Sequence, residues 1–142
     1  NNKRGMAWAL IGWGWHQCLL GNLDEAEALI ARASDCFEQD AHRLWGMVMV
    51  DNIRAEIACS RGNFMTARQL IDTAIDGAEK CQSIMFQTRN WVTLARIFAD
   101  NGDKHTALIW LEKAIAHHAT WADIRDRALQ LQNEWLVMLA RA

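Results

Sequence analysis

The sequence contains no proline, and this absence favours a helical chain. None of the 142 residues is Pro, and only 8 are Gly. Proline interrupts helices more strongly than any other residue, and β-branched residues form few runs here. We therefore expect an all-α protein. With 51% apolar and 23% charged residues, the chain is neither a disordered segment nor a small disulfide-stabilised protein, and its length suits one domain with a buried core.

The sequence also lacks the features that several functional classes require. Lys and Arg number 15 against 17 Asp and Glu, whereas a broad nucleic-acid surface needs a basic excess. No apolar run approaches the roughly 20 residues of a membrane span. The histidines are scattered, no phosphate-binding glycine loop is present, and no nucleophilic side chain has a recognisable base at a supporting spacing. We expect no metal, no cofactor, no membrane or direct nucleic-acid contact, and no catalysis.

The cysteines and the first residues bear on the cellular compartment. Cys18, Cys36, Cys59 and Cys81 are too widely spaced for a zinc or redox motif, so we expect reduced and mostly buried thiols. The chain begins at Asn1 without Met and without the apolar stretch of a secretory signal. We therefore expect a cytoplasmic protein, and the missing Met suggests a piece cut from a longer chain.

A repeat organises the sequence around three glycines. Gly21, Gly62 and Gly102 fall 41 and then 40 residues apart, and each is followed by Asn or Asp. Each also precedes an Ala, a large aliphatic residue and a second Ala at the same offsets. These positions are Ala26, Ile30 and Ala33; Ala67, Ile71 and Ala74; and Ala107, Leu111 and Ala114. Agreement among three copies is a much stronger signal than one short motif.

Each repeated residue type has a role in a pair of antiparallel helices. Gly can adopt the left-handed conformation that ends a helix, and the Asn or Asp after it can accept hydrogen bonds from the next helix's first amides. The small Ala residues let two helices approach closely. Thr120, with Asp123 after it, resembles a capping box. The expected helices span roughly 5–20, 23–39, 42–60, 63–80, 84–100, 103–118 and 121–141.

The third copy carries a specific family resemblance. Its pattern of aromatic, aliphatic and small residues is similar to the signature of the tetratricopeptide repeat (TPR). The residues that carry it are Trp91, Leu94, Ala95, Phe98, Gly102, Ala107, Leu111 and Ala114. The resemblance implies a TPR-like solenoid, a right-handed superhelix of antiparallel helix pairs at about 5–40, 42–81 and 84–118. The helix at 121–141 is then a C-terminal cap or the first helix of a truncated fourth pair.

Two departures from the usual TPR bear on function. The repeats here are 40–41 residues long rather than about 34, and no Pro closes the second helix. Repeats of this length resemble those of bacterial regulatory proteins, in which a TPR array lies beside a DNA-binding or nucleotide-cyclase output domain. The resemblance therefore implies one domain over residues 1–142 with a role in signalling or transcription regulation.

In the TPR pattern, the first helix of each pair lines a concave surface. This placement selects seven candidate partner-binding residues: Trp8, Trp15, Met49, Asn52, Glu56, Arg89 and Arg96. The groove grades from aromatic to cationic, and Arg125 and Arg127 extend its positive end. Aromatic residues and Arg often carry interface energy, so we expect a protein segment with an apolar anchor and an acidic group. Trp13, Trp91 and Trp135 are expected in the core.

Three functions remain open at this point. The first is a non-catalytic interaction module that holds a partner segment in the groove. The second is a structural or dimerisation spacer, whose Trp-rich first helix and terminal helix pack on another copy or on a neighbouring domain. The third is a small-ligand sensor, with an apolar or anionic effector held among Trp8, Trp15, Met49 and Arg89.

Overall fold

The computed structural model describes residues 2–142, and within them the chain consists of helices joined by short turns. Seven helices follow one another, and no strand occurs in this range. Their bounds are α1 Lys3–Leu19, α2 Leu23–Phe37, α3 Arg43–Ser60, α4 Phe64–Lys80, α5 Ile84–Asp100, α6 Lys104–Ala116 and α7 Ala122–Arg141. The all-α prediction is confirmed, and each expected range overlaps one helix. None of these helices has both the length and the apolar character needed to cross a membrane.

The three repeated glycines end the first helix of each pair, as expected. Gly21, Gly62 and Gly102 have φ angles of +83°, +78° and +96°, in the left-handed region that glycine adopts without a steric penalty. The helices on either side of each glycine, α1 with α2, α3 with α4 and α5 with α6, pack directly against each other. The neighbouring pairs inferred from the repeat are therefore present.

The expected helix caps are only partly present. Asp103 accepts a hydrogen bond from the Thr106 amide at 3.1 Å and so caps α6. Asn22 and Asn63, at the corresponding positions of the first two copies, make no such bond. The capping-box interpretation of Thr120 is wrong, because its hydroxyl donates instead to the Ala114 carbonyl at 2.6 Å and fastens the turn to α6.

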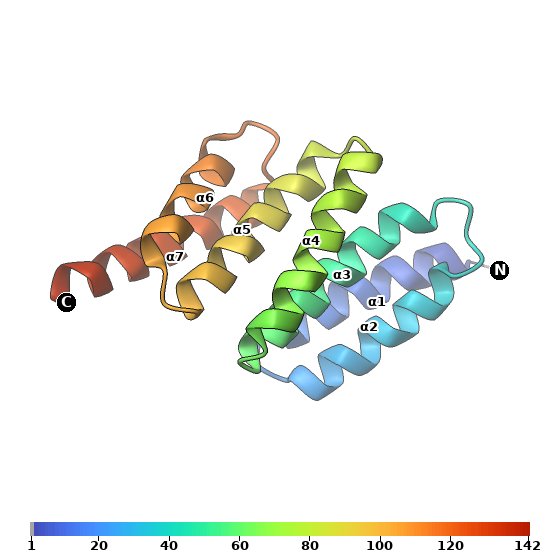
Figure 1. Ribbon diagram of the computed structural model, residues 1–142. Helices are drawn as coiled ribbons and strands as arrows, with labels where there is room; N and C mark the ends of the chain where they lie inside the picture. The colour runs from blue at the N-terminus through green and yellow to red at the C-terminus, as the bar shows by residue number, and fades with distance from the viewer. Residues whose placement is uncertain (1) are drawn as a thin grey trace.

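The odd-numbered helices form one continuous layer. α1 packs on α3, α3 on α5 and α5 on α7, whereas within residues 2–142 no similar packing joins α2 to α4 or α4 to α6. Each even-numbered helix packs against the odd-numbered helices on either side of it. The pairs progress from α1 and α2 at one end of the molecule to α6 and α7 at the other, so the termini lie far apart (Figure 1).

Close helix approach depends on small residues at the pair contacts. The six repeated Ala side chains are fully buried, as expected for positions where two helices meet. Two glycines inside helices have the same role. A Cβ on Gly14 would lie 2.6 Å from the Ile30 side chain, and a Cβ on Gly46 would lie 2.5 Å from the Phe37 ring. These two positions have no room for a larger residue unless the neighbour moves.

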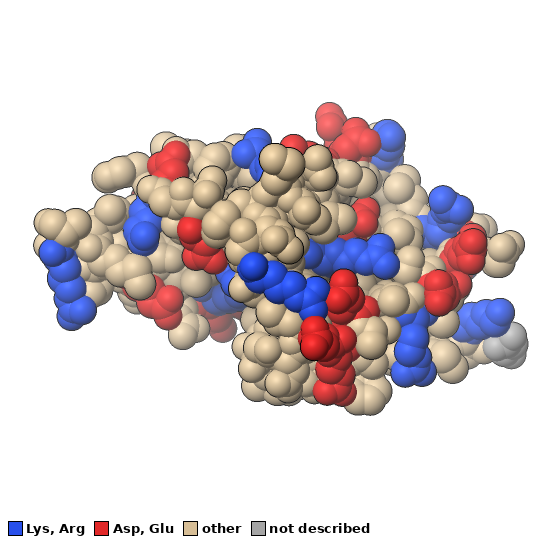
Figure 2. Space-filling model, turned by 60° about the horizontal axis from the view of Figure 1, so that its bottom comes forward, with Lys and Arg blue, Asp and Glu red and all other residues tan. Residues whose placement is uncertain are grey.

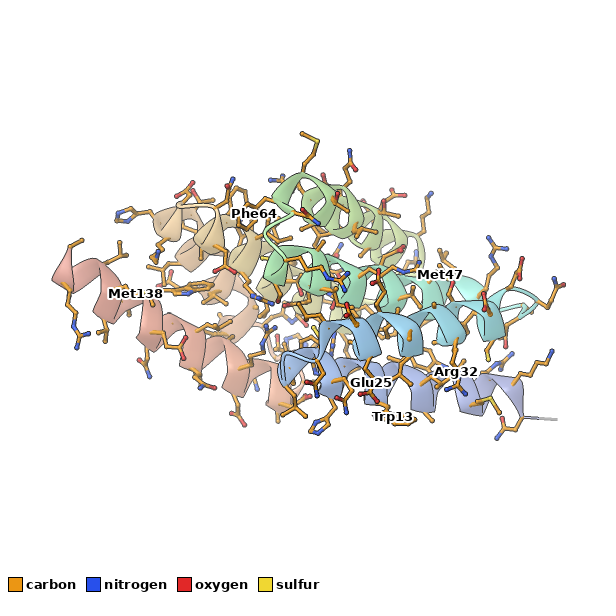
Figure 3. The ribbon with its side chains drawn as sticks, turned by 90° about the horizontal axis from the view of Figure 1, so that it is seen from below. Trp13, Glu25, Arg32, Met47, Phe64 and Met138 are labelled. Carbon is orange, nitrogen blue, oxygen red and sulfur yellow. The ribbon has the colours of Figure 1, made fainter. Side chains whose placement is uncertain are left out.

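The prediction that Trp13 is a core residue is wrong. Trp91 and Trp135 are buried as expected, but the Trp13 side chain is 51% exposed. Figure 3 shows it at the edge of α1, pointing away from the other helices. Trp13 occupies the repeat position of Leu94, which is buried. The difference arises because α1 begins the odd-numbered layer, and among the described residues no helix covers this side of it.

Candidate functional site

The face of the odd-numbered layer is organised around one buried carboxylate. Glu56, in the middle of α3, is fully buried. Arg127 of α7 donates to both of its oxygens, Nη1 to Oε1 at 2.9 Å and Nη2 to Oε2 at 3.1 Å. Arg96 of α5 donates to Oε2, and the Thr93 hydroxyl donates to Oε1 at 2.8 Å. Side chains from two other helices, α5 and α7, therefore converge on one negative charge of α3.

Electrostatics explain how this charge is tolerated inside the protein. Burial alone would raise the pKa of Glu56, but the charges and hydrogen bonds of Arg127 and Arg96 hold that pKa well below its ordinary value. Arg96 also forms an ion pair with Asp100 and donates to the Ser60 hydroxyl at 2.6 Å. Glu56 is thus ionised at neutral pH, and Arg127 and Arg96 share its single negative charge.

A second group of polar side chains extends the network along α3 and α5. Asn52 donates to Asn90 Oδ1 at 2.9 Å and to Thr93 Oγ1 at 3.1 Å. Its own Oδ1 accepts from Arg89 Nε at 3.2 Å. All four residues are buried. Each of these hydrogen bonds joins α3 to α5, so the network fixes how the second helix pair sits against the third.

Trp15 of α1 packs on two arginines of this network. The Arg89 guanidinium lies 4.3 Å from the centre of the indole ring, and the Arg127 guanidinium lies 5.0 Å from it. Burial lowers the pKa of Arg89 to about 10, so Arg89 still carries its charge at neutral pH. Its Nη2 is buried and has no hydrogen-bond acceptor. The face of Trp15 stabilises this cation in place of a carboxylate.

Aromatic side chains gather at the N-terminal ends of the odd-numbered helices. Phe86 of α5 stacks with Trp8 at 6.3 Å between ring centres and makes edge contacts with Trp45 at 5.6 Å and Trp121 at 5.9 Å. Trp8 also contacts Phe37 at 5.4 Å. A hollow of about 370 Å³ opens beside this cluster. We call it the aromatic hollow; its lining is Arg4, Trp8, Phe37, Asp40, His42 and Trp45.

The rim of the aromatic hollow carries charges that neutralise each other. Arg4 donates to both Asp40 oxygens, at 2.8 and 2.9 Å, and the His42 amide donates to the same carboxylate at 2.7 Å. The walls are aromatic, and Trp8 and Trp45 remain 36% and 42% exposed. The hollow therefore suits an uncharged apolar group.

A second hollow, of about 460 Å³, lies between the C-terminal part of α1 and the outer side of α7. We call it the α1–α7 cleft; its lining is Trp15, Leu19, Asp123, Ile124, Asp126, Arg127, Gln130, Leu131 and Glu134. Its floor is largely apolar and its polar rim belongs to α7. The view in Figure 3 shows α7 extending from the end of α1 at this side of the molecule.

The structure places the seven candidate residues on one face but leaves few of them accessible. Trp8 is partly exposed, while Trp15 and Arg96 are half-buried. The other four, Met49, Asn52, Glu56 and Arg89, are buried. Met49 belongs to the hydrophobic core, and the other three bind one another or their neighbours. These four hold the layer together, and the accessible surface lies in the two hollows beside them.

Sequence reasoning missed several residues of these hollows although a signal for them existed. Trp45 lies one helical turn before Met49 and continues the stripe of Met49, Asn52 and Glu56. Phe86 extends the stripe of Arg89 in the same way. The acidic side chains of α7 had no such signal, because only the folded chain brings them to the hollow that Trp15 and Leu19 line.

Comparison of this chain with protein-family models, with curated protein sequences and with solved structures found no match in any of the three. The TPR-like interpretation and the candidate binding residues therefore stay predictions. Within residues 2–142, no group of three or more His, Cys, Asp or Glu side chains is placed to hold a metal ion. Figure 2 shows acidic and basic side chains interspersed on the face in view, without a continuous basic surface there.

Proposed function

We propose that this chain is a TPR-like helical-repeat module that binds a segment of another protein on the face of α1, α3, α5 and α7. The binding involves no chemistry. We further propose that the module works in the cytoplasm as part of a signalling or transcription regulator. The repeat of 40–41 residues and the continuous odd-numbered layer support this interpretation.

The aromatic hollow is the observation that carries the proposal. Trp and Tyr in partly exposed, preformed hollows are the side chains that most often anchor a partner. Trp8 and Trp45 form walls of such a hollow, and the core behind them keeps both in place. An apolar side chain of the partner, inserted between the two indoles, is the expected anchor.

Selection from a random peptide library displayed on phage tests the proposal. We expect the immobilised protein to enrich peptides that share an aliphatic or aromatic anchor. Trp45→Ala should weaken their binding by about 2 kcal/mol, the usual cost of removing an anchoring Trp. Trp13→Ala is the matched control, because Trp13 is also exposed, at 51% against 42% for Trp45, and lies outside both hollows. Circular dichroism confirms that both variants are folded.

Two results would contradict the proposal. One is the absence of any motif enriched above a selection without protein. The other is a set of enriched peptides that bind Trp45→Ala as tightly as the wild type.

A specific observation keeps the dimerisation spacer as a second candidate. The C-terminal part of α7 exposes Leu136, Val137 and Met138, and Met138 is marked in Figure 3. A second copy packed on this side would bury them. Light scattering over a range of protein concentrations distinguishes the two: a mass that rises toward twice the monomer favours the spacer, and a constant monomer mass excludes it.

A further inference from the structure

The two hollows lie along one line on the same face. Trp8 and Trp15 are seven residues apart in α1, so they share one side of the helix and are separated by about 10 Å. Side chains of α7 reach Trp15 and Leu19 at the C-terminal part of α1. The Phe86 ring contacts both Trp8 and Trp121, and the Arg127 guanidinium packs on the Trp15 ring. One extended segment can therefore contact both the aromatic hollow and the α1–α7 cleft.

The basic side chains near the cleft already have partners within the protein or are buried. Arg127 forms two hydrogen bonds with Glu56, and Arg96 binds Glu56 and Asp100. Arg89 is buried beneath Trp15. Arg125 donates to the Ile115 and His117 carbonyls. Each of these side chains is thus paired with a carboxylate, bonded to backbone carbonyls or buried.

The acidic side chains on the rim are exposed and, among residues 2–142, form no ion pair. Asp123, Asp126 and Glu134 all line the cleft and are all exposed. Within residues 2–142, none of the three has a Lys, Arg or His within ion-pair distance. The accessible charge of the cleft is therefore negative, although the sequence around it is rich in Arg.

The floor of the cleft is apolar, so a bound segment must also offer apolar surface. Trp15, Leu19, Ile124 and Leu131 line it below the carboxylates. Lys and Arg side chains suit such a combination, because their aliphatic stems can lie on apolar surface while their charged ends reach the rim. An acidic segment would meet three like charges, which opposes binding.

We infer that the α1–α7 cleft binds a basic stretch of the partner segment, about three extended residues from the apolar anchor in the aromatic hollow. Lys or Arg stems lie on Trp15 and Leu19, and their charges meet the rim carboxylates of α7. The inference rests on the proposed function and names the charge of the partner. It reverses the acidic partner expected from the sequence, because Arg96 and Arg127 are paired with Glu56 and Arg89 is buried, while the rim carboxylates of α7 are exposed.

Two matched fluorescent peptides test the inference by fluorescence anisotropy. One carries a Leu followed, about three residues later, by two Lys; the other has Glu in place of Lys. We expect the Lys peptide to bind the wild type at least about tenfold more tightly than the Glu peptide, with an affinity that falls as salt is added. Binding of the Lys peptide should also shift the Trp15 indole N–H resonance.

Charge reversal on α7 locates the site. The double variant Asp126→Lys and Glu134→Lys should weaken the Lys peptide by about tenfold, since each reversal replaces an attraction with a repulsion. Glu112→Lys is the matched control, because it reverses an exposed carboxylate of α6 that does not line the cleft. Glu112→Lys should leave the Kd of the Lys peptide within about twofold of the wild-type value. The Kd is measured in the same way for the α7 double variant.

The outcomes separate this inference from the proposed function. Equal binding of the two peptides, no binding of the Lys peptide, or equal effects of the α7 and Glu112 variants would overturn the inference. If the display-selected peptides still depend on Trp45 in that case, the proposed function stands without it. If the Lys peptide binds through α7 while no peptide depends on Trp45, the aromatic anchor is wrong and the acidic cleft remains.

Discussion

Glu56 is a fully buried carboxylate, and its negative charge needs positive charges and hydrogen bonds around it. Moving a charge out of water costs several kcal/mol, and only well-placed opposite charges and hydrogen bonds offset that cost. Arg96, Arg127 and Thr93 supply them from two other helices. Removing a single member of this group leaves the others unpaired in the interior, which is strongly destabilising.

We expect Glu56→Gln to lower the free energy of unfolding by about 3 kcal/mol, the lower end of the cost of breaking a buried ion pair. The lower end applies because the Arg96 and Arg127 side chains keep 20% and 18% of their exposure. Urea unfolding followed by circular dichroism measures the change. Glu112→Gln, at an exposed position of α6, should stay within about 0.5 kcal/mol of the wild type. Equal stability of the two variants would be inconsistent with the role given to Glu56.

The same residue makes stability depend on pH. Because the pKa of Glu56 is lower in the folded protein than in the unfolded chain, the unfolded state takes up the proton first as the pH falls. Its contribution is fully present above the ordinary Glu pKa of about 4.3 and is lost progressively below it. We expect the difference in unfolding free energy between the wild type and Glu56→Gln to shrink below about pH 4.

Urea titrations at a series of pH values measure this difference. Asp40 and Asp103 also have a lowered pKa, from hydrogen bonds with Arg4 and Thr106, and they add to the acid sensitivity of the wild type. They are present in both proteins, so they cancel in the comparison. A difference that stays constant down to about pH 3 would show that Glu56 does not titrate in the expected range.

At the scale of a helix, two glycines inside helices differ in what surrounds them. Gly12 and Gly46 both lie inside helices, where glycine is less favourable than Ala. No atom lies within 4 Å of a Cβ built on Gly12, whereas a Cβ on Gly46 would overlap the Phe37 ring. One glycine is thus needed for packing and the other is not.

Substitution by Ala should therefore have opposite effects at these two positions. We expect Gly12→Ala to raise the unfolding free energy by about 0.5–1 kcal/mol through helix propensity. Gly46→Ala should lower it by about 1–3 kcal/mol, since the Phe37 ring cannot move aside without disturbing the contact of α2 with α3. Thermal unfolding of the two variants tests the pair, and a gain in stability at both positions would show that Phe37 adapts freely.

For the whole molecule, the core is divided between two clusters that share α5. The larger one draws buried side chains from α1 to α5, and the smaller one joins α5, α6 and α7. In a chain of helix pairs, each element is stabilised mainly by its neighbours, so the parts need not open together. α7 is held by the smaller cluster and by the bond between Arg127 and Glu56.

Native-state hydrogen exchange should therefore show α7 opening before α3. We expect Arg127→Ala to speed exchange of the α7 amides by at least about tenfold, because hydrogen bonds to a charged group stabilise by roughly 1.5–3 kcal/mol. Arg141→Ala, an exposed residue at the end of the same helix, is the control and should change little. Simultaneous exchange of α3 and α7 in the wild type would indicate that the molecule opens as one unit.

The sequence by itself determined the helices, the turns at Gly21, Gly62 and Gly102, and the buried Ala stripes. These features follow from local conformational preference and from a repeat whose copies can be compared along the chain. The resemblance of the repeat to the TPR pattern also predicted a shared face for Trp8, Trp15, Met49, Asn52, Glu56, Arg89 and Arg96. A composition without proline and a periodic pattern of small residues are sufficient for conclusions at this level.

Only the tertiary structure decided which of those side chains remain accessible. Glu56 and Arg127 are 71 residues apart, and their contact depends on how four helices accumulate into one layer. That contact pairs Arg127 with a buried carboxylate, whereas within residues 2–142 the α7 carboxylates of the cleft rim have no basic partner and supply its exposed charge. The exposure of Trp13 is decided in the same way, because a repeat position is buried only when another helix covers it. The accessible charge of a surface depends on which ions are paired beneath it, and that pairing is a property of the folded chain.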